Sequence, residues 1–148
     1  NMIDAAFDTA SRLFGLKFKE LPDAPRYHPD VRAWEVTTKA GEPVGVFLGD
    51  YFARPSKRSG AWMSSFRARH KLGKGSKPVI VNVLNFARGA EGKPTLLSID
   101  DARTLFHEFG HGLHGLLSDV TYPTLSGTNV SRDFVELPSQ LYEHWLTR

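Results

Sequence analysis

The 148-residue chain contains no cysteine, which excludes disulfide bonds and metal sites built from thiolates. Any zinc site in this protein must therefore use histidine, aspartate or glutamate side chains. The absence of cysteine also suits a reducing compartment.

Long apolar runs and targeting signals are missing as well. No apolar run approaches the roughly 20 residues that cross a membrane, and residues 1–4 lack the basic and apolar regions of a signal peptide. The composition, with 41% hydrophobic and 24% charged residues, is that of one packed domain. We therefore expect a cytoplasmic monomer with no membrane partner.

Acidic residues are absent from residues 54–77, which carry eight lysines or arginines, whereas residues 100–148 carry seven acids against three bases. A basic stretch can bind nucleic acid, but only Trp62 and Phe66 are available here to stack on bases. The acidic second half opposes this alternative, and the glycines and lysines of residues 71–77 are typical of a solvated loop. We expect no nucleic-acid partner.

The first part of the chain predicts one helix and a sheet. Apolar residues recur at helical spacing over residues 3–14, and Gly15 follows as a stop. Residues 33–37 and 43–48 predict two strands joined by a turn, and residues 79–84 predict a third. The third strand is apolar on both faces, which indicates an interior position in the sheet.

The second part predicts two helices. Ser98 and Asp101 form a capping-box signal for the start of a helix. Its buried side comprises Leu105, Phe106, Phe109, Leu113, Leu116 and Leu117. After a loop at residues 126–129, Val135, Tyr142 and Leu146 predict a last helix, bent near Pro138. We expect an α+β fold, with a helix and sheet region at 1–97 and a helical region at 98–148.

The segment His107-Glu108-Phe109-Gly110-His111 is an HExxH motif inside the predicted helix. The two histidines then lie one turn apart on one face, spaced to share a metal ion, and Glu108 can reach a water on that metal. A catalytic zinc usually takes three protein ligands and leaves one position for water. His114 continues the same stripe and is expected to form hydrogen bonds behind the ligands.

The third ligand is not decided by spacing. Downstream donors are Asp119, Asp133, Glu136, Glu143 and His144. Gly110, Gly112 and Gly115 each cost about 1 kcal/mol in a helix interior, which indicates that a partner helix crosses very close to them. The residues alone leave Glu136, Glu143 and Asp133 as competing candidates.

The motifs together resemble the thimet-oligopeptidase family of zinc peptidases, most closely its bacterial peptidyl-dipeptidase branch. The resemblance rests on F-H-E-F-G-H at 106–111, S-G-T-N at 126–129 and R-D-F-V-E-L-P-S-Q at 132–140. Residues 27–32 and 58–62 are also similar, so the likeness runs along essentially the whole chain. It implies that Glu136 is the third ligand of one zinc ion and that Glu108 is the general base. It also implies a zincin-like catalytic region, truncated at both ends and belonging to a longer parent chain.

The activity implied by the resemblance is hydrolysis of short peptides, with release of C-terminal dipeptides. Endopeptidase action of the same family is an alternative. A catalytically silent fragment is another, because the family's oxyanion-stabilising Tyr and His residues have no counterpart here. Replacement of His107, Glu108 or His111 would favour a silent scaffold, and none is replaced.

Further candidates for substrate and metal contacts follow from residue type alone. Arg54 and Arg58 could recognise a terminal carboxylate by charge, with a solvated turn as the alternative. The Gly60-Ala61 segment could pair with an extended peptide as an edge strand. Asp133 is a candidate partner behind the zinc ligands.

Overall fold

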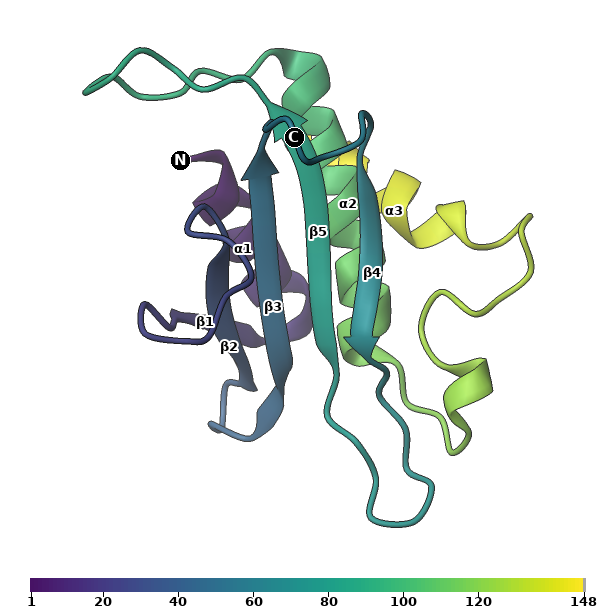
Figure 1. Cartoon of the computed structure of the whole chain (residues 1–148). Helices are drawn as coiled ribbons and strands as arrows, with labels where there is room; N and C mark the ends of the chain where they lie inside the picture. Colours follow the sequence, from purple (N-terminus) through teal and green to yellow (C-terminus); the bar gives the residue numbers. More distant parts are fainter. Residues whose placement is uncertain (148) are drawn as a thin grey trace.

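The computed structural model describes residues 1–147 as a mixed α+β fold in which helices cover one face of a five-stranded sheet (Figure 1). The elements are α1 (Met2–Phe14), β1 (Leu16–Glu20), β2 (Arg32–Thr38), β3 (Pro43–Phe52), β4 (Trp62–Arg67), β5 (Val79–Phe86), α2 (Ile99–Leu117) and α3 (Glu136–Glu143). Two 3₁₀ turns, Pro123–Leu125 and His144–Thr147, flank α3. The α+β prediction is confirmed, and the zincin-like assignment stays a prediction.

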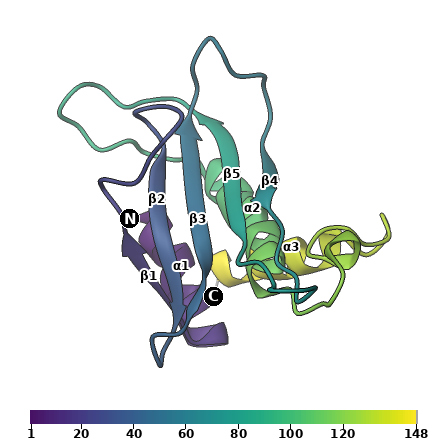
Figure 2. The ribbon, with the colours of Figure 1, turned by 60° about the horizontal axis from the view of Figure 1, so that its bottom comes forward.

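The sheet order is β1-β2-β3-β5-β4, with β3 and β5 parallel and the other pairs antiparallel. Figure 2 shows the sheet from another side, with β1 and β4 at its two edges. Since β5 lies between β3 and β4, the loop at residues 53–61 must cross the carboxyl end of β5. This crossing places the start of β4 beside the last residues of β5.

The predicted elements are largely confirmed. Helix α1 ends at Gly15, whose φ of 67° is the left-handed conformation that glycine adopts without strain. The predicted strands fall within β2, β3 and β5, and β5 is interior as expected. Strands β1 and β4 were not predicted, because both lie at edges and expose many of their side chains.

The expected bend at Pro138 is wrong. Pro138 is the third residue of α3, in the first turn, where a backbone N–H has no partner within the helix. Val135 lies just before the helix rather than inside it. The proline therefore belongs to the start of the helix and does not interrupt it.

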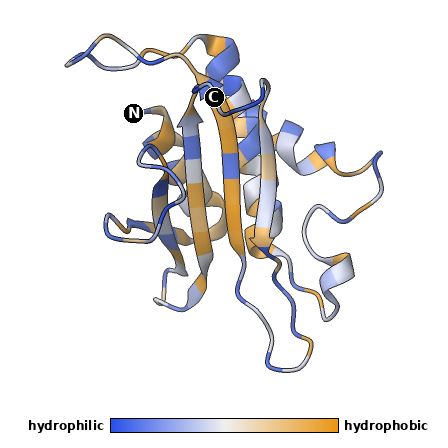
Figure 3. Cartoon of the chain, viewed as in Figure 1, coloured by the Kyte–Doolittle hydropathy of each residue, from blue (hydrophilic) through white to orange (hydrophobic). Residues whose placement is uncertain are grey.

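Buried side chains form one hydrophobic cluster on each face of the sheet. The larger cluster lies between the sheet and the helices, where Phe7, Phe47 and Phe109 meet with ring centroids 5.1–6.1 Å apart. The smaller cluster, on the other face, includes Val81 and Trp62. Figure 3 shows how strongly apolar residues concentrate along β5. This packing holds α2 against the centre of the sheet.

A buried ionic network ties the crossing loop to the sheet. Asp50, which is 1% exposed, accepts hydrogen bonds from both Nη atoms of Arg54 at 2.7 and 2.8 Å and from the hydroxyl of Tyr27 at 2.8 Å. The buried Lys57 donates to the Asp50 carboxylate and to the carbonyls of Phe52 and Leu84. Burial alone would raise the pKa of Asp50, but the hydrogen bonds from Arg54 and Tyr27 hold it below its usual value.

We expect Asp50→Ala to lower the free energy of unfolding by about 3 to 5 kcal/mol, because it leaves two buried cations without their carboxylate. Urea unfolding at pH 7 measures this change. The control is Asp119→Ala, whose ion pair with Lys71 is about 60% exposed on both sides and should contribute little. An equally small effect at Asp50 would contradict the role of the network.

Candidate metal centre

Helix α2 carries the HExxH motif, as predicted. The Ser98 hydroxyl caps the helix by accepting a hydrogen bond from the Asp101 backbone N–H, and the Asp101 carboxylate accepts one from the Ser98 backbone N–H. The apolar side predicted for this helix is buried, except that Leu117 is only half-buried. His107 and His111 lie side by side on the remaining face, with ring centroids 4.8 Å apart.

Glu136, the first residue of α3, completes a cluster with these two histidines. Its Oε2 lies 3.0 Å from His107 Nε2 and 3.1 Å from His111 Nε2. One donor atom from each residue falls within 4.8 Å of the others, which is the arrangement that could hold a metal ion. Among the three candidates that spacing left open, Glu136 is therefore the one beside both histidines.

Close packing of α3 on α2 brings Glu136 into place. A Cβ at Gly110 would lie 2.7 Å from the backbone Cα of Ser139, so only glycine permits this approach. The Ser139 hydroxyl lies 3.1 Å from Glu136 Oε2 and 2.9 Å from its carbonyl oxygen. At the other end of α3, the Tyr142 hydroxyl donates to the Ala6 carbonyl at 2.6 Å.

The expectation that all three helical glycines face a crossing helix is wrong for two of them. Gly112 faces Phe47 and Asn82 of the sheet, and Gly115 faces Met63 and Ile80. These two glycines bring α2 close to the sheet instead. Sequence spacing could not show which glycine contacts α3 and which contact the sheet, because these glycines lie on different faces of the same helix.

We expect Gly110→Ala to weaken metal binding by at least about tenfold and to lower stability, because the new methyl group pushes the backbone of α3 away from α2. The matched control is Gly112→Ala, whose Cβ would meet no backbone atom, only a phenyl carbon of Phe47 at 3.3 Å and the Asn82 amide at an ordinary contact distance of 3.6 Å. Titration with zinc followed by calorimetry compares the two. Equal affinities would show that the close approach at Gly110 does not set the ligand geometry.

Glu143 occupies the opposite side of His107. Its Oε1 lies 2.6 Å from His107 Nδ1, where it can accept the proton of that nitrogen and leave Nε2 free for a metal. Glu143 follows Glu136 by seven residues, or two helical turns, so both carboxylates lie on one face of α3. That spacing was the available signal that these two glutamates act on the same histidine.

The other predicted partners are not brought to the ligands. Asp133 is exposed in the turn before α3, and the structure gives its side chain no hydrogen bond to a cluster residue. His114 packs beside Phe134, and its Nδ1 is buried without a hydrogen-bond partner among the described residues. Burial lowers the pKa of His114, which favours the neutral ring.

The cluster fits a divalent metal ion with a water beside it. Burial lowers the pKa of His111, which favours the neutral imidazole that a metal requires. Glu108 is 7% exposed, and its Oε2 has no hydrogen-bond partner in the described part of the chain. Burial, aided by the charge of Glu136, raises the pKa of Glu108 to about 7. A carboxylate with this pKa can exchange a proton near neutral pH.

We expect the metal-free chain to lose stability as the pH rises from 4.5 to 7, since folded Glu108 keeps its proton where the unfolded residue has lost it. Glu108→Gln removes this loss. The variant should match the wild type at pH 4.5 and exceed its free energy of unfolding by about 3 kcal/mol at pH 8. Urea unfolding with a chelator at both pH values measures the difference, and a constant difference would contradict the raised pKa.

The predicted substrate contacts lie apart from the cluster. Arg54 is engaged by Asp50, and the Arg58 guanidinium stacks 4.3 Å from the centre of the Trp62 ring. Trp62 belongs to the hydrophobic cluster on the face away from the helices, whereas its neighbour Met63 contacts α2. The structure thus gives both arginines partners within the chain, Asp50 for Arg54 and the Trp62 ring for Arg58. Residues 60 and 61 do immediately precede the edge strand β4.

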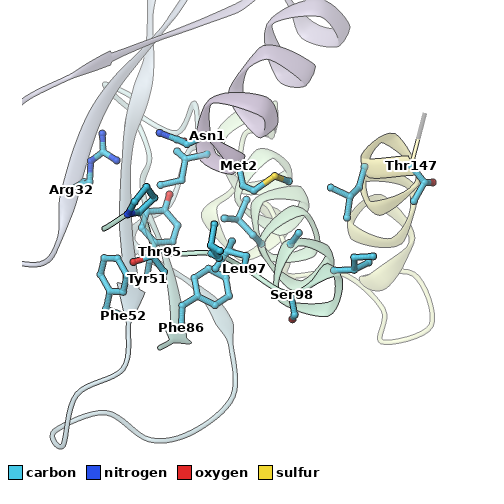
Figure 4. A pocket seen from close by; sticks show the side chains of 17 residues that line it. Asn1, Met2, Arg32, Tyr51, Phe52, Phe86, Thr95, Leu97, Ser98 and Thr147 are labelled. Atoms are coloured by element: carbon cyan, nitrogen blue, oxygen red, sulfur yellow. The ribbon is translucent and has the colours of Figure 1, made fainter. Parts of the chain in front are cut away.

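An apolar groove of about 710 Å³ opens elsewhere on the helix side (Figure 4). Tyr51, Phe52, Phe86 and Leu97 line it, together with Leu105 from the early part of α2. None of the metal-cluster residues does. The groove is therefore separate from the candidate metal centre.

Comparison with known proteins agrees with the geometry. The sequence model of peptidase family M3 matches residues 1–148. The chain belongs to peptidase family M3. The resemblance inferred from the motifs is thereby confirmed.

Individual relatives match almost the whole chain. It is 55% identical to dipeptidyl carboxypeptidase of Escherichia coli over 97% of the chain and 21% of that protein. It is 42% identical to oligopeptidase A of Escherichia coli and 36% identical to a thimet-like oligopeptidase of Dictyostelium discoideum, each over 97% of the chain and 22% of the relative. The chain thus spans about a fifth of the length of these relatives. Within residues 1–147, no helix is long and apolar enough to cross a membrane.

Proposed function

We propose that this chain carries the catalytic centre of a zinc peptidase, in which His107, His111 and Glu136 bind one zinc ion and Glu108 is the general base. The observation that carries the proposal is the meeting of three donor atoms from two helices within 4.8 Å. The buried, unpartnered carboxylate oxygen of Glu108 adds to it. Membership of a peptidase family supports the same chemistry.

Two imidazoles and one carboxylate are a ligand set found in catalytic zinc sites, where the fourth position is left for water. A bound zinc ion supplies Lewis-acid chemistry, lowering the pKa of a water toward neutrality and polarising the scissile carbonyl. The chain's own residues supply the proton transfers and the orientation of the ligands.

Glu108 takes the proton of the attacking water and delivers it to the leaving amine. Burial raises the pKa of Glu108 in the metal-free chain, and a cation bound beside it would lower that pKa and favour the carboxylate form that a base requires. Glu143 orients His107 through the 2.6 Å contact to Nδ1. Ser139 restrains the Glu136 carboxylate in the same way.

The proposed substrates are short peptides that pair with the free edge of β4 near Gly60 and Ala61. Release of C-terminal dipeptides is favoured by the 55% identity to a protein named dipeptidyl carboxypeptidase. Endopeptidase action is the alternative, since oligopeptidase A is 42% identical. We propose that groups outside these 148 residues supply the oxyanion donors and the terminal-carboxylate contact, because Asp50 engages Arg54 and the Trp62 ring engages Arg58.

The test is the zinc content of the purified chain after exhaustive dialysis, measured by elemental analysis. We expect one zinc ion in the wild type and in Glu108→Gln, and loss of zinc in Glu136→Gln, because Glu136 is a proposed ligand and Glu108 is not. In the full-length parent enzyme, cleavage of short peptides should disappear in Glu108→Gln, because Glu108 is the proposed base.

A folded wild-type chain without zinc would overturn the proposed centre. Zinc retained at full stoichiometry and affinity in Glu136→Gln would assign the third ligand elsewhere. Circular dichroism of each variant separates these outcomes from a failure to fold.

A further inference from the structure

Strand β5 carries two asparagines in an otherwise apolar run, and hydrophilic bands interrupt the strand in Figure 3. Asn82 is 1% exposed, and it lies at the centre of the sheet between β3 and β4. A buried side-chain amide is costly unless its polar atoms find partners. The partners of both asparagines lead to the proposed active site.

Asn82 holds the catalytic helix. Its Nδ2 donates to the backbone carbonyl of Glu108 at 2.8 Å, in the interior of the protein. That carbonyl also accepts the helical hydrogen bond from the N–H of Gly112, since a carbonyl oxygen has two lone pairs. The Asn82 amide lies against this turn of α2, with its nitrogen at an ordinary contact distance of 3.6 Å from where a Cβ at Gly112 would lie.

Asn85 holds the start of the edge strand. Its Nδ2 donates to the carbonyls of Arg58 and Gly60 at 2.9 and 2.7 Å, which uses both amide hydrogens. Both carbonyls belong to the loop that crosses the end of β5. The ammonium group of Lys57 binds the Leu84 carbonyl one residue earlier on the same strand. The end of β5 is thus the support on which the crossing loop rests.

The two contacts fix a distance along one rigid strand. Asn82 contacts the Glu108 carbonyl and Asn85 contacts the Gly60 carbonyl. The two contacts are therefore three residues apart along β5, which corresponds to about 10 Å. Side chains of α2 lean toward its N-terminus, and α2 runs antiparallel to β5, so Glu108 leans toward the Gly60 end. The two contacts therefore hold Glu108 and the Gly60 segment at a fixed offset along the strand.

We propose that Asn82 and Asn85 are positioning residues. Asn82 fixes the position of the general base Glu108, and Asn85 fixes the position of the peptide-pairing edge at Gly60 and Ala61. Strand β5 thereby holds the base and the edge in a constant relative position. The inference rests on the proposed function for its consequence in catalysis. Its structural content does not, because each asparagine restrains a different backbone segment whether or not the chain cleaves peptides.

The variants Asn82→Leu and Asn85→Leu remove each amide with little change in volume. The control is Val81→Ala, on the same strand but in the cluster of the opposite face. Backbone amide exchange in the zinc-loaded chain, followed by NMR, is the first measurement. We expect about tenfold faster exchange at residues 58–63 in Asn85→Leu alone, and at residues 111–113 in Asn82→Leu alone, from the loss of one local hydrogen bond.

Peptide cleavage is the second measurement, made with the full-length parent enzyme because groups outside these 148 residues are proposed to supply the oxyanion donors. We expect Asn85→Leu to raise KM about tenfold with kcat retained, because the pairing edge is displaced. Asn82→Leu should lower kcat about tenfold with KM retained, because the base is displaced. A residue with only a structural role would not divide the two constants in this way, and Val81→Ala should leave both unchanged.

The two measurements distinguish a failure of the proposed function from a failure of the positioning role. A full-length parent enzyme that binds zinc but cleaves nothing would count against the proposed function, while the exchange pattern would still decide the positioning. Uniform exchange changes, or changes equal to those of Val81→Ala, would overturn the positioning role even in an active enzyme.

Discussion

The close approach of α3 to α2 is the contact on which the candidate metal centre depends. Backbone meets backbone where Gly110 faces Ser139, and the same approach sets Glu136 beside two histidines that come from the other helix. Neither helix holds the cluster alone. α2 can present two imidazoles one turn apart, but the carboxylate comes from a segment 25 residues after His111, and only packing brings it back.

The fold was predictable where a segment carries its own local signal in the sequence. The apolar run of β5, the capping box at Ser98 and the glycine after α1 are local signals, and each marked its element correctly. The edge strands were not predictable in this way, because β4 exposes most of its side chains and pairs only because β5 offers a free side. Such a strand is specified by its neighbour more than by its own pattern.

In the site, too, some features follow from local sequence and others only from packing. The histidine pair and Glu108 follow from helical periodicity, whereas the choice among Glu136, Glu143 and Asp133 needs the crossing of two helices. The structure gives Glu136 and Glu143 to opposite nitrogens of His107 and leaves Asp133 exposed. The role of the two arginines selected by charge stays a prediction, and their contacts with Asp50 and Trp62 could not be read from sequence spacing. An analysis of hydrophobic patterns does not detect the role of asparagines in an apolar strand.

The hydrogen bond from Tyr142 to the Ala6 carbonyl joins residues 136 positions apart. It connects the helix that carries Glu136 to the first helix of the chain, which offers no metal ligand. Any metal held by the cluster therefore favours the docked state of α1, and by thermodynamic reciprocity the docking of α1 strengthens metal affinity. The N-terminal helix is in this sense an energetic part of the metal centre.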